Sequence, residues 1–321
     1  MSKRVLSLVL GLILIMGLFA GCSAGKDEFP NKIITIVVPY SPGGASDTVA
    51  RLYAQELEKA IGTSIVVTNK TGASGAVGLE AVKNSKADGY TIAYMPVEST
   101  MIKSLGLTDI TSDDFTFIGR AMTIPAAVTV RSDAPWNTLE EFLTYAKEHP
   151  GEVQVGNSGT GSIWHISAAL LEDNSGAQFT HVPFDGAAPA IAALMGDNIQ
   201  AVTVSPSEVQ SGVESGDFKV LAVLGEERSS ILPDIPTAKE LGIDVVAQGW
   251  GAFAVPKDTP ADVVKILEDA SKTALNSDNI KNLLAERGFE HAYMSGSDMD
   301  SYAKEQLDKF SELIPKLGIV Q

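Results

Sequence analysis

The sequence is poor in cysteine, histidine and basic residues. Its 321 residues include one cysteine, Cys22, and four histidines, at positions 149, 165, 181 and 291. A single cysteine excludes a disulfide within the chain, and the histidines lack the H-E-x-x-H spacing of a zinc protease. Lys and Arg number 24 against 40 Asp and Glu, a net charge of −16, which argues against nucleic acid or a polybasic contact with membranes. We therefore expect no metal, no cofactor and no nucleic-acid partner.

Long apolar runs are absent except at the N-terminus. Residues 1–4 are MSKR, and the 16 residues that follow, VLSLVLGLILIMGLFA, are predominantly apolar. This run is shorter than the roughly 20 residues that span a bilayer, so we expect an export signal over residues 1–21. The segment LFAGC resembles a bacterial lipoprotein processing site, in which the cysteine receives a lipid. We expect a lipid on Cys22, a polar tether over residues 22–29, and a location on the outer face of the cell membrane.

From residue 30 onward the sequence alternates strand and helix patterns. KIITIVVPY leads into a helix that Gly62 ends, and SIVVTN, YTIAYM, AAVTVRS and VQVGN are further strands separated by helical segments. Near the C-terminus, Thr259 and Ser297 are predicted N-caps of amphipathic helices. The length exceeds what one core usually serves, so we expect two lobes. The alternation predicts an α/β fold with mixed, largely parallel sheets flanked by helices, and ligands beyond the carboxyl ends of the strands.

The first glycine loop, YSPGGASD over residues 40–47, joins a strand to a helix. Glycine lets another group approach the backbone, and the first turn of a helix presents unpaired N–H groups at the positive end of its dipole. Such a turn binds anions without a basic side chain. Asp47 is predicted to be an N-cap or first-turn residue that fixes the loop. A plain tight turn is the alternative. The candidate ligand-binding residues here are Tyr40, Ser41, Gly43, Gly44 and Asp47.

The second glycine loop, GNSGTGSIWH over residues 156–165, repeats this arrangement with added hydroxyl groups. A third turn, VPFDGAAPA, also runs from strand to helix, so the cleft between the lobes is predicted to hold charge from both sides. Aromatic side chains near the loops either line the ligand or belong to the core. The further candidate ligand-binding residues are Asn157, Ser158, Thr160, Gly161, Ser162, His165, Phe184, Asp185 and Trp250.

Seven segments follow one another along residues 30–321: VVPYSPGGASDTVAR, VVTNKTGASGAVG, DGYTI, GNSGTGSIWH, THVPFDGAAPAIAALMG, LPDIPTAKELG and GWGAFAVPKDTP. Together they resemble the extracytoplasmic solute-binding subunits of tripartite tricarboxylate transporters, the Bug family. The resemblance implies a two-lobed periplasmic-binding-protein fold of type II-like form that closes on a small carboxylate. It implies lobe 1 over residues 30–128 plus 250–321 and lobe 2 over residues 129–249.

The same resemblance implies partners and a binding mode. The partners are the large and small membrane subunits of the transporter, and we expect the receptor to be a monomer. In the family, backbone groups of the first loop and of a second-lobe loop hold one ligand carboxylate, partly through water. On this chain those segments are Tyr40 to Asp47 and Asn157 to His165.

Two positions depart from the family pattern. Thr71 stands where a proline is usual, and Asp185 stands where many members carry lysine. If Asp185 faces the cleft, it favours a ligand with an amine or hydroxyl, and an exposed loop aspartate is the alternative. Two other functions stay open. One is a receptor for a sensor kinase, which the absence of a neighbouring gene pair for membrane subunits would indicate. The other is an exported serine hydrolase using Ser158, His165 and Asp185. GNSGTG lacks the G-x-S-x-G elbow of the latter.

Overall fold

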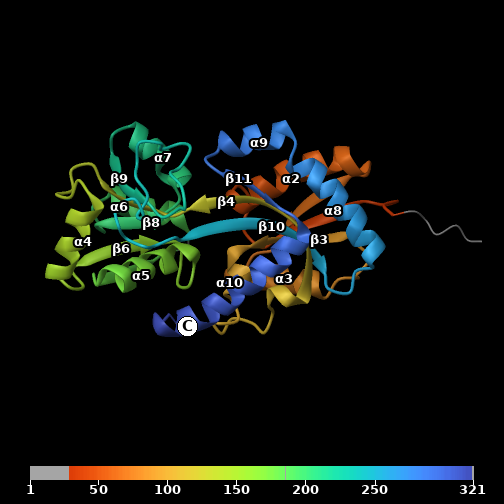
Figure 1. Cartoon of the computed structure of the whole chain (residues 1–321), viewed down its shortest axis with the longest axis horizontal. Helices are drawn as coiled ribbons and strands as arrows, with labels where there is room; N and C mark the ends of the chain where they lie inside the picture. Colours follow the sequence, from red (N-terminus) through yellow and green to blue (C-terminus); the bar gives the residue numbers. More distant parts are fainter. Residues whose placement is uncertain (1–28, 185, 320–321) are drawn as a thin grey trace, which may run out of the picture.

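The computed structural model describes residues 29–184 and 186–319. The predicted signal segment over residues 1–21, the lipidation site Cys22 and Asp185 lie outside the described residues, as do all but the last residue of the predicted tether. Two lobes lie side by side, and the long strands β4 (Phe115–Pro125) and β10 (Gln248–Pro256) run from one toward the other (Figure 1). No helix in the part of the chain that the structure describes is both long and apolar enough to cross a membrane.

The first lobe is built on a six-stranded sheet with the order β11-β4-β10-β3-β1-β2. Its other strands are β1 (Ile34–Val38), β2 (Ile65–Asn69), β3 (Thr91–Pro96) and β11 (Glu290–Met294). The helices that accompany it are α2 (Ala45–Ile61), η1 (Ala73–Gly75), α3 (Ala76–Lys83), η2 (Val97–Thr100), η3 (Ser112–Asp114), α8 (Ala261–Leu275), α9 (Asp278–Ala285) and α10 (Gly296–Lys316).

The second lobe is built on a five-stranded sheet with the order β7-β6-β8-β5-β9. Its strands are β5 (Ala127–Arg131), β6 (Val153–Asn157), β7 (Phe179–Pro183), β8 (Ala201–Val204) and β9 (Phe218–Val223). The helices that accompany it are α4 (Leu139–Glu148), α5 (Ile163–Ser175), α6 (Ala187–Met195) and α7 (Pro206–Glu214). The α/β class and the two-sheet architecture predicted from the sequence are confirmed.

The sheets are less parallel than the alternation of strands and helices suggests. Parallel pairing joins β1 to β2 and β3, and β6 to β7 and β8. The remaining pairings between the named strands are antiparallel, and every one of them involves β4, β5 or β10. These are the strands at the two points where the chain passes between the sheets: at Ala126, and between Val223 and Gln248. The numbered lobe limits given above stay a prediction.

Helix ends agree with the sequence patterns to within two residues. Gly62 ends α2 with a left-handed φ of 74°, as predicted. The N-cap of α8 is Pro260, one residue beyond the predicted Thr259, whose hydroxyl instead donates to the Pro256 carbonyl. Ser295 caps α10, two residues before the predicted Ser297, because its hydroxyl accepts the Asp298 N–H. The prediction of a serine N-cap was correct, but this helix start contains two serines, and the cap is the first of them.

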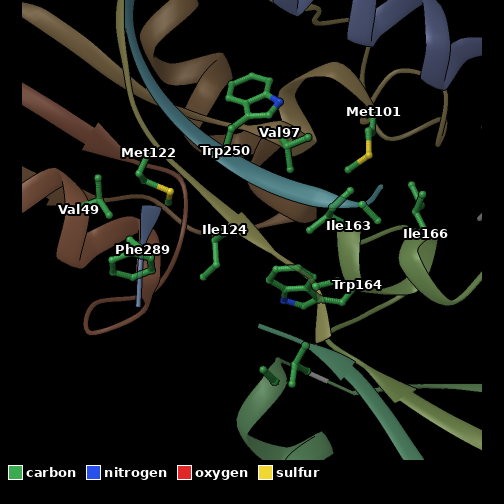
Figure 2. Packing of buried hydrophobic residues seen from close by; sticks show 14 of the residues in the cluster. Val49, Val97, Met101, Met122, Ile124, Ile163, Trp164, Ile166, Trp250 and Phe289 are labelled. Atoms are coloured by element: carbon green, nitrogen blue, oxygen red, sulfur yellow. The ribbon is translucent and has the colours of Figure 1, made fainter. Parts of the chain in front are cut away.

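Apolar side chains from both lobes meet in one buried cluster. Figure 2 shows Val97 and Met101, from the chain after β3, gathered in one part of this cluster with Ile163 and Ile166 of α5. At the same junction Gly161 has a φ of 75°, and a Cβ built on it would lie 2.5 Å from the Leu105 side chain. The two lobes therefore touch next to the second glycine loop, and any larger residue at position 161 would require the Leu105 side chain to shift.

We expect the Gly161→Ala substitution to destabilise the protein more than Gly176→Ala. Both positions have nearly the same φ, 75° and 76°, but nothing lies within 4 Å of a Cβ on Gly176. Each substitution incurs the left-handed backbone cost of roughly 1–2 kcal/mol, and Gly161→Ala adds a clash costing about 1–3 kcal/mol. Urea unfolding measures both, and adding Leu105→Ala should relieve part of the Gly161→Ala loss. Equal losses for the two glycine variants would contradict the close approach.

Candidate functional site

The first glycine loop follows β1 and opens α2, so it lies at the carboxyl end of a parallel strand. Gly43 has a φ of 85°, and Gly44 is the N-cap of α2. The buried Asp47 carboxylate accepts the Gly43 N–H, the Arg51 Nε and the Asn69 Nδ2, each at 2.9 Å. Asp47 lies in the first turn and fixes the loop, which is one of the two positions that the sequence predicts for it.

The electrostatics of Asp47 match this structural role. Burial alone would raise its pKa, but hydrogen bonds from Arg51, Gly43 and Asn69 outweigh burial and lower the pKa from 3.8 to about 2. Asp47 is 3% exposed, and its carboxylate is turned toward its own loop. Its oxygens are engaged by protein donors, so Asp47 fixes the shape of the turn, and the turn also contains exposed neighbours. Those neighbours are Ser41, Gly43 and Gly44.

The second glycine loop follows β6 and opens α5. The Asn157 Oδ1 accepts the Gly159 N–H at 3.0 Å, and the His165 Nδ1 accepts the Gly161 N–H at 3.0 Å. Ser162 caps α5, with its hydroxyl accepting the His165 N–H at 3.2 Å. Around these contacts the hydroxyl-bearing residues are half-buried, namely Ser158, Thr160 and Ser162.

Both loops are held by the same hydrogen-bond pattern. In each, a glycine with positive φ donates its N–H to a side chain four residues later, Gly43 to Asp47 and Gly161 to His165. The helix N-cap residue lies directly after that glycine in both cases. The accepting side chain therefore turns the loop so that the remaining first-turn N–H groups point outward. The sequence shows two similar loops, and the structure shows why they share one shape.

The Asn157 side chain is buried and only half satisfied. Its Oδ1 is used by Gly159, whereas its Nδ2 has no hydrogen-bond partner among the described residues. Buried polar groups are nearly always hydrogen-bonded, so an unpartnered donor in a loop of this kind is suited to a ligand oxygen or an ordered water. Asn157 was among the residues predicted from the sequence.

His165 is neutral at physiological pH. Burial, and to a smaller extent the neighbouring His181 ring, lower the pKa of His165 from 6.5 to about 4, although Glu172 acts in the opposite direction. The His165 and His181 rings lie 4.6 Å apart in an edge-to-face arrangement, and His181 Nε2 lies 2.7 Å from Glu172 Oε2. A neutral ring with Nδ1 as acceptor is what the Gly161 N–H requires. His165 therefore uses Nδ1 to accept the Gly161 N–H. The sequence analysis had anticipated a direct contact between His165 and the ligand.

The predicted aromatic residues separate into different environments. Trp250 is 2% exposed in β10 and packs edge-on against Phe117 and Tyr302, with ring centroids 6.3 Å apart in each pair. This placement favours the core alternative for Trp250. Phe184 is half-buried beside the second loop, where its N–H donates to the Asn157 carbonyl at 3.0 Å. Of the two, Phe184 is the one that adjoins the loops.

Tyr40 lies close to Glu98, a residue that the sequence analysis did not single out. The half-buried Tyr40 hydroxyl donates to the Ser74 carbonyl at 3.2 Å, and the Glu98 carboxyl group lies close to it. Burial, followed by the nearby Glu98, raises the pKa of Tyr40 well above 10. Glu98 follows β3, which pairs in parallel with β1. The rule that ligands bind beyond the carboxyl ends of parallel strands could have identified it.

Two further features concern sites other than the glycine loops: a separate cavity, and groups of side chains that could hold a metal ion. A cavity of about 270 Å³ is lined by residues outside both glycine loops, including Lys257 and Lys304. Within residues 29–184 and 186–319, no group of three or more His, Cys, Asp or Glu side chains could hold a metal ion.

The Asp47→Asn variant should lose about 2 kcal/mol of unfolding free energy at pH 7, because the folded state lowers the pKa of Asp47. This contribution is present above the unfolded-state pKa and is lost as the pH falls from about 4 to about 2. Urea unfolding of variant and wild type from pH 7 to pH 3 should show their difference shrinking. Asp133→Asn, which removes an exposed ion pair with Arg131, is the control and should have a smaller effect. A constant Asp47→Asn difference over this range would contradict the assignment.

The stability of the wild type should fall by about 3 kcal/mol through His165 as the pH drops from about 6.5 to about 4. The sign follows because the lowered pKa makes the folded state bind fewer protons than the unfolded state in this window. His165→Asn keeps an acceptor for the Gly161 N–H without titrating, so its unfolding free energy should change less over the same range. His149→Asn is the control. If His165→Asn kept the wild-type pH dependence, His165 would not be the group responsible.

Comparison with known proteins places this geometry in a family. Residues 49–319 match the model described as "Tripartite tricarboxylate transporter family receptor". A ligand-free TctC solute-binding protein from Polaromonas is 40% identical, with a TM-score of 0.78 over 90% of this chain and 99% of that one. The Rhodopseudomonas palustris proteins Rpa4515 with adipate and MatC with malate are 27% and 26% identical, with TM-scores of 0.82 and 0.77. They cover 92% and 89% of this chain and 100% of their own.

The family model spans most of the described residues, and the solved structures share both the two-sheet architecture and the near-complete chain length. The family consists of solute-binding receptors and not of enzymes. The chain belongs to the tripartite tricarboxylate transporter receptor family.

Proposed function

We propose that the protein captures a small organic carboxylate outside the cell membrane and delivers it to the large and small membrane subunits of a tripartite tricarboxylate-type transporter. The observation that carries this proposal is the pair of glycine loops, each held by a side chain four residues on, through the Gly43–Asp47 and Gly161–His165 hydrogen bonds. Support also comes from the adipate and malate complexes of structurally similar proteins. The lipid anchor on Cys22 is part of the same proposal.

Backbone groups of the first lobe and side-chain groups of the second lobe hold the ligand carboxylate. On the first lobe the donors are first-turn N–H groups of α2 beside the exposed Gly43 and Gly44. On the second lobe the donors are the half-buried loop hydroxyls of residues 158–162 and the unpartnered Asn157 Nδ2. Charge-assisted hydrogen bonds contribute about 1.5–3 kcal/mol each, so four or five can give micromolar affinity after the ordering costs.

Closure of the lobes accompanies binding. The Gly161 backbone lies against Leu105 of the first lobe, so the second glycine loop and the junction of the lobes would move together on closure. Because the carboxylate is held by contacts and dipoles at short range, the net charge of −16 does not prevent binding: exposed charges are screened over about 8 Å.

A thermal-shift screen tests the proposal with adipate, malate, citrate, acidic amino acids and aromatic acids as probes. A binder at 100 times its dissociation constant should add about 2.7 kcal/mol of stability. Asn157→Asp should abolish most of that shift, because it keeps the acceptor for Gly159 and replaces the free donor by a negative charge. Asn282→Asp adds the same charge at an exposed position of α9 and should leave the shift intact. No shift with any acid, or equal shifts in both variants, would contradict the proposal.

A further inference from the structure

The cavity of about 270 Å³ in the first lobe has a lining that no function described so far uses. Two lysines, two aspartates, two serines and two buried phenylalanines form this lining, and they come from η3, β4, α10 and the residue after β10. Its volume is just below the roughly 300 Å³ at which ligand pockets usually begin, so an occupant has to be small. None of the lining residues belongs to either glycine loop.

The charged groups of this cavity are of both signs, yet they form no ion pair. The cavity is lined by four charged side chains, Asp113, Lys257, Asp300 and Lys304. Among the ion pairs formed by residues 29–184 and 186–319, none includes any of the four. Asp300 and Lys304 are one turn apart on α10, and side chains with this spacing have Cβ atoms about 5–6 Å apart. A carboxylate and an ammonium group thus line the same small space without neutralising each other.

The surroundings of Asp300 are predominantly negative. Its Oδ1 accepts the Phe117 N–H at 3.2 Å, which holds the carboxyl group in place. Burial raises the pKa of Asp300, although the Phe117 N–H and Lys257 counteract burial. Asp113 raises this pKa further, and the pKa of Glu268 is in turn raised by burial and by Asp300. An ammonium group beside Asp300 would offset this excess of negative charge.

Ser112 provides an observation that is independent of the charges. This residue of η3 lines the cavity and is 4% exposed, and its Oγ has no hydrogen-bond partner among the residues that the structure describes. Buried polar groups are nearly always hydrogen-bonded. A polar group of a molecule in the cavity can supply the partner that the protein itself does not.

We infer that this cavity binds a short zwitterion, a small molecule that carries an ammonium group and an anionic group only a few bonds apart. The ammonium group lies at Asp300 and the anionic group at Lys304, each in a charge-assisted hydrogen bond. The one-turn spacing of these two residues on α10 limits the length of the ligand to that of an α- or β-amino acid. A dicarboxylate is rejected, because its second carboxylate would meet Asp113 and Asp300. This site is additional to the proposed carboxylate site and does not rest on it.

Nuclear magnetic resonance of the ¹⁵N-labelled protein tests the inference, with β-alanine as the probe. Propionate and ethylammonium are the matched probes, because each keeps the two-carbon chain and one of the two charged groups of β-alanine. Titration with β-alanine should give saturable shifts that are largest for the backbone amides of residues 112–117 and 300–304. Each probe with a single charge should bind about tenfold more weakly, since it loses one charge-assisted hydrogen bond.

Two variants locate the charges that bind β-alanine. Lys304→Gln removes the positive charge, and Asp300→Asn removes the negative charge while keeping an acceptor for the Phe117 N–H. Each should weaken β-alanine binding about tenfold. Lys309→Gln and Asp308→Asn are the controls, because they remove the same charges at exposed positions of α10 outside the cavity lining, and they should leave the affinity unchanged.

Three results would overturn the inference: no saturable shifts at residues 112–117 and 300–304, equal affinities for β-alanine and propionate, or equal losses in the cavity variants and their controls. Shifts that are largest in the glycine loops would also overturn it, although they would agree with the proposed function. The screen with adipate, malate and citrate tests that function separately, so either proposal can fail while the other holds.

Discussion

The geometry of the site depends on one hydrogen bond that occurs twice: a loop glycine N–H donated to the third residue of the helix that follows. Gly43 donates to Asp47 and Gly161 donates to His165. Each bond satisfies one backbone N–H inside the protein and fixes the direction of the others in the first helical turn. Without it the loop would have to be ordered by the ligand, at the ligand's expense in affinity. In the proposed function, preorganisation of this kind lets backbone N–H groups hold an anion without a basic side chain in contact with it.

The two acceptors differ in charge, and the difference has a physical reason. Asp47 has Arg51 and Asn69 as additional donors, so its negative charge is compensated where it is buried. His165 packs against His181, which in turn pairs with the Glu172 carboxylate. A neutral acceptor at position 165 avoids repulsion with that carboxylate. Glu98, which accepts the Ile163 N–H, lacks such compensation, because no ion pair among the described residues includes it. In an acidic protein, the distribution of the charges and their partners decides which anions can enter.

Much of the architecture could be predicted from the sequence, and the errors have identifiable causes. Helix α2, its Gly62 end and the structural role of Asp47 follow from local patterns, because caps and first turns involve residues within a few positions of each other. Antiparallel pairing of β4 and β10 could not be predicted, since strand patterns give burial and not partners. Contacts between distant segments were missed for the same reason, above all Glu98 with Ile163, 65 residues away. Trp250 lies next to a motif in the sequence but packs in the core.

The central claim, that the two glycine loops bind the carboxylate through first-turn N–H groups of α2 and the Asn157 side chain, is tested most directly by nuclear magnetic resonance of the ¹⁵N-labelled protein during titration with adipate. Hydrogen bonds to a carboxylate move amide proton resonances downfield. The account predicts saturable downfield shifts that are largest for the backbone amides of residues 44–47 and for the side-chain amide of Asn157. Saturable binding whose largest shifts fall elsewhere, for example around Lys257 and Lys304 at the separate cavity, would contradict it.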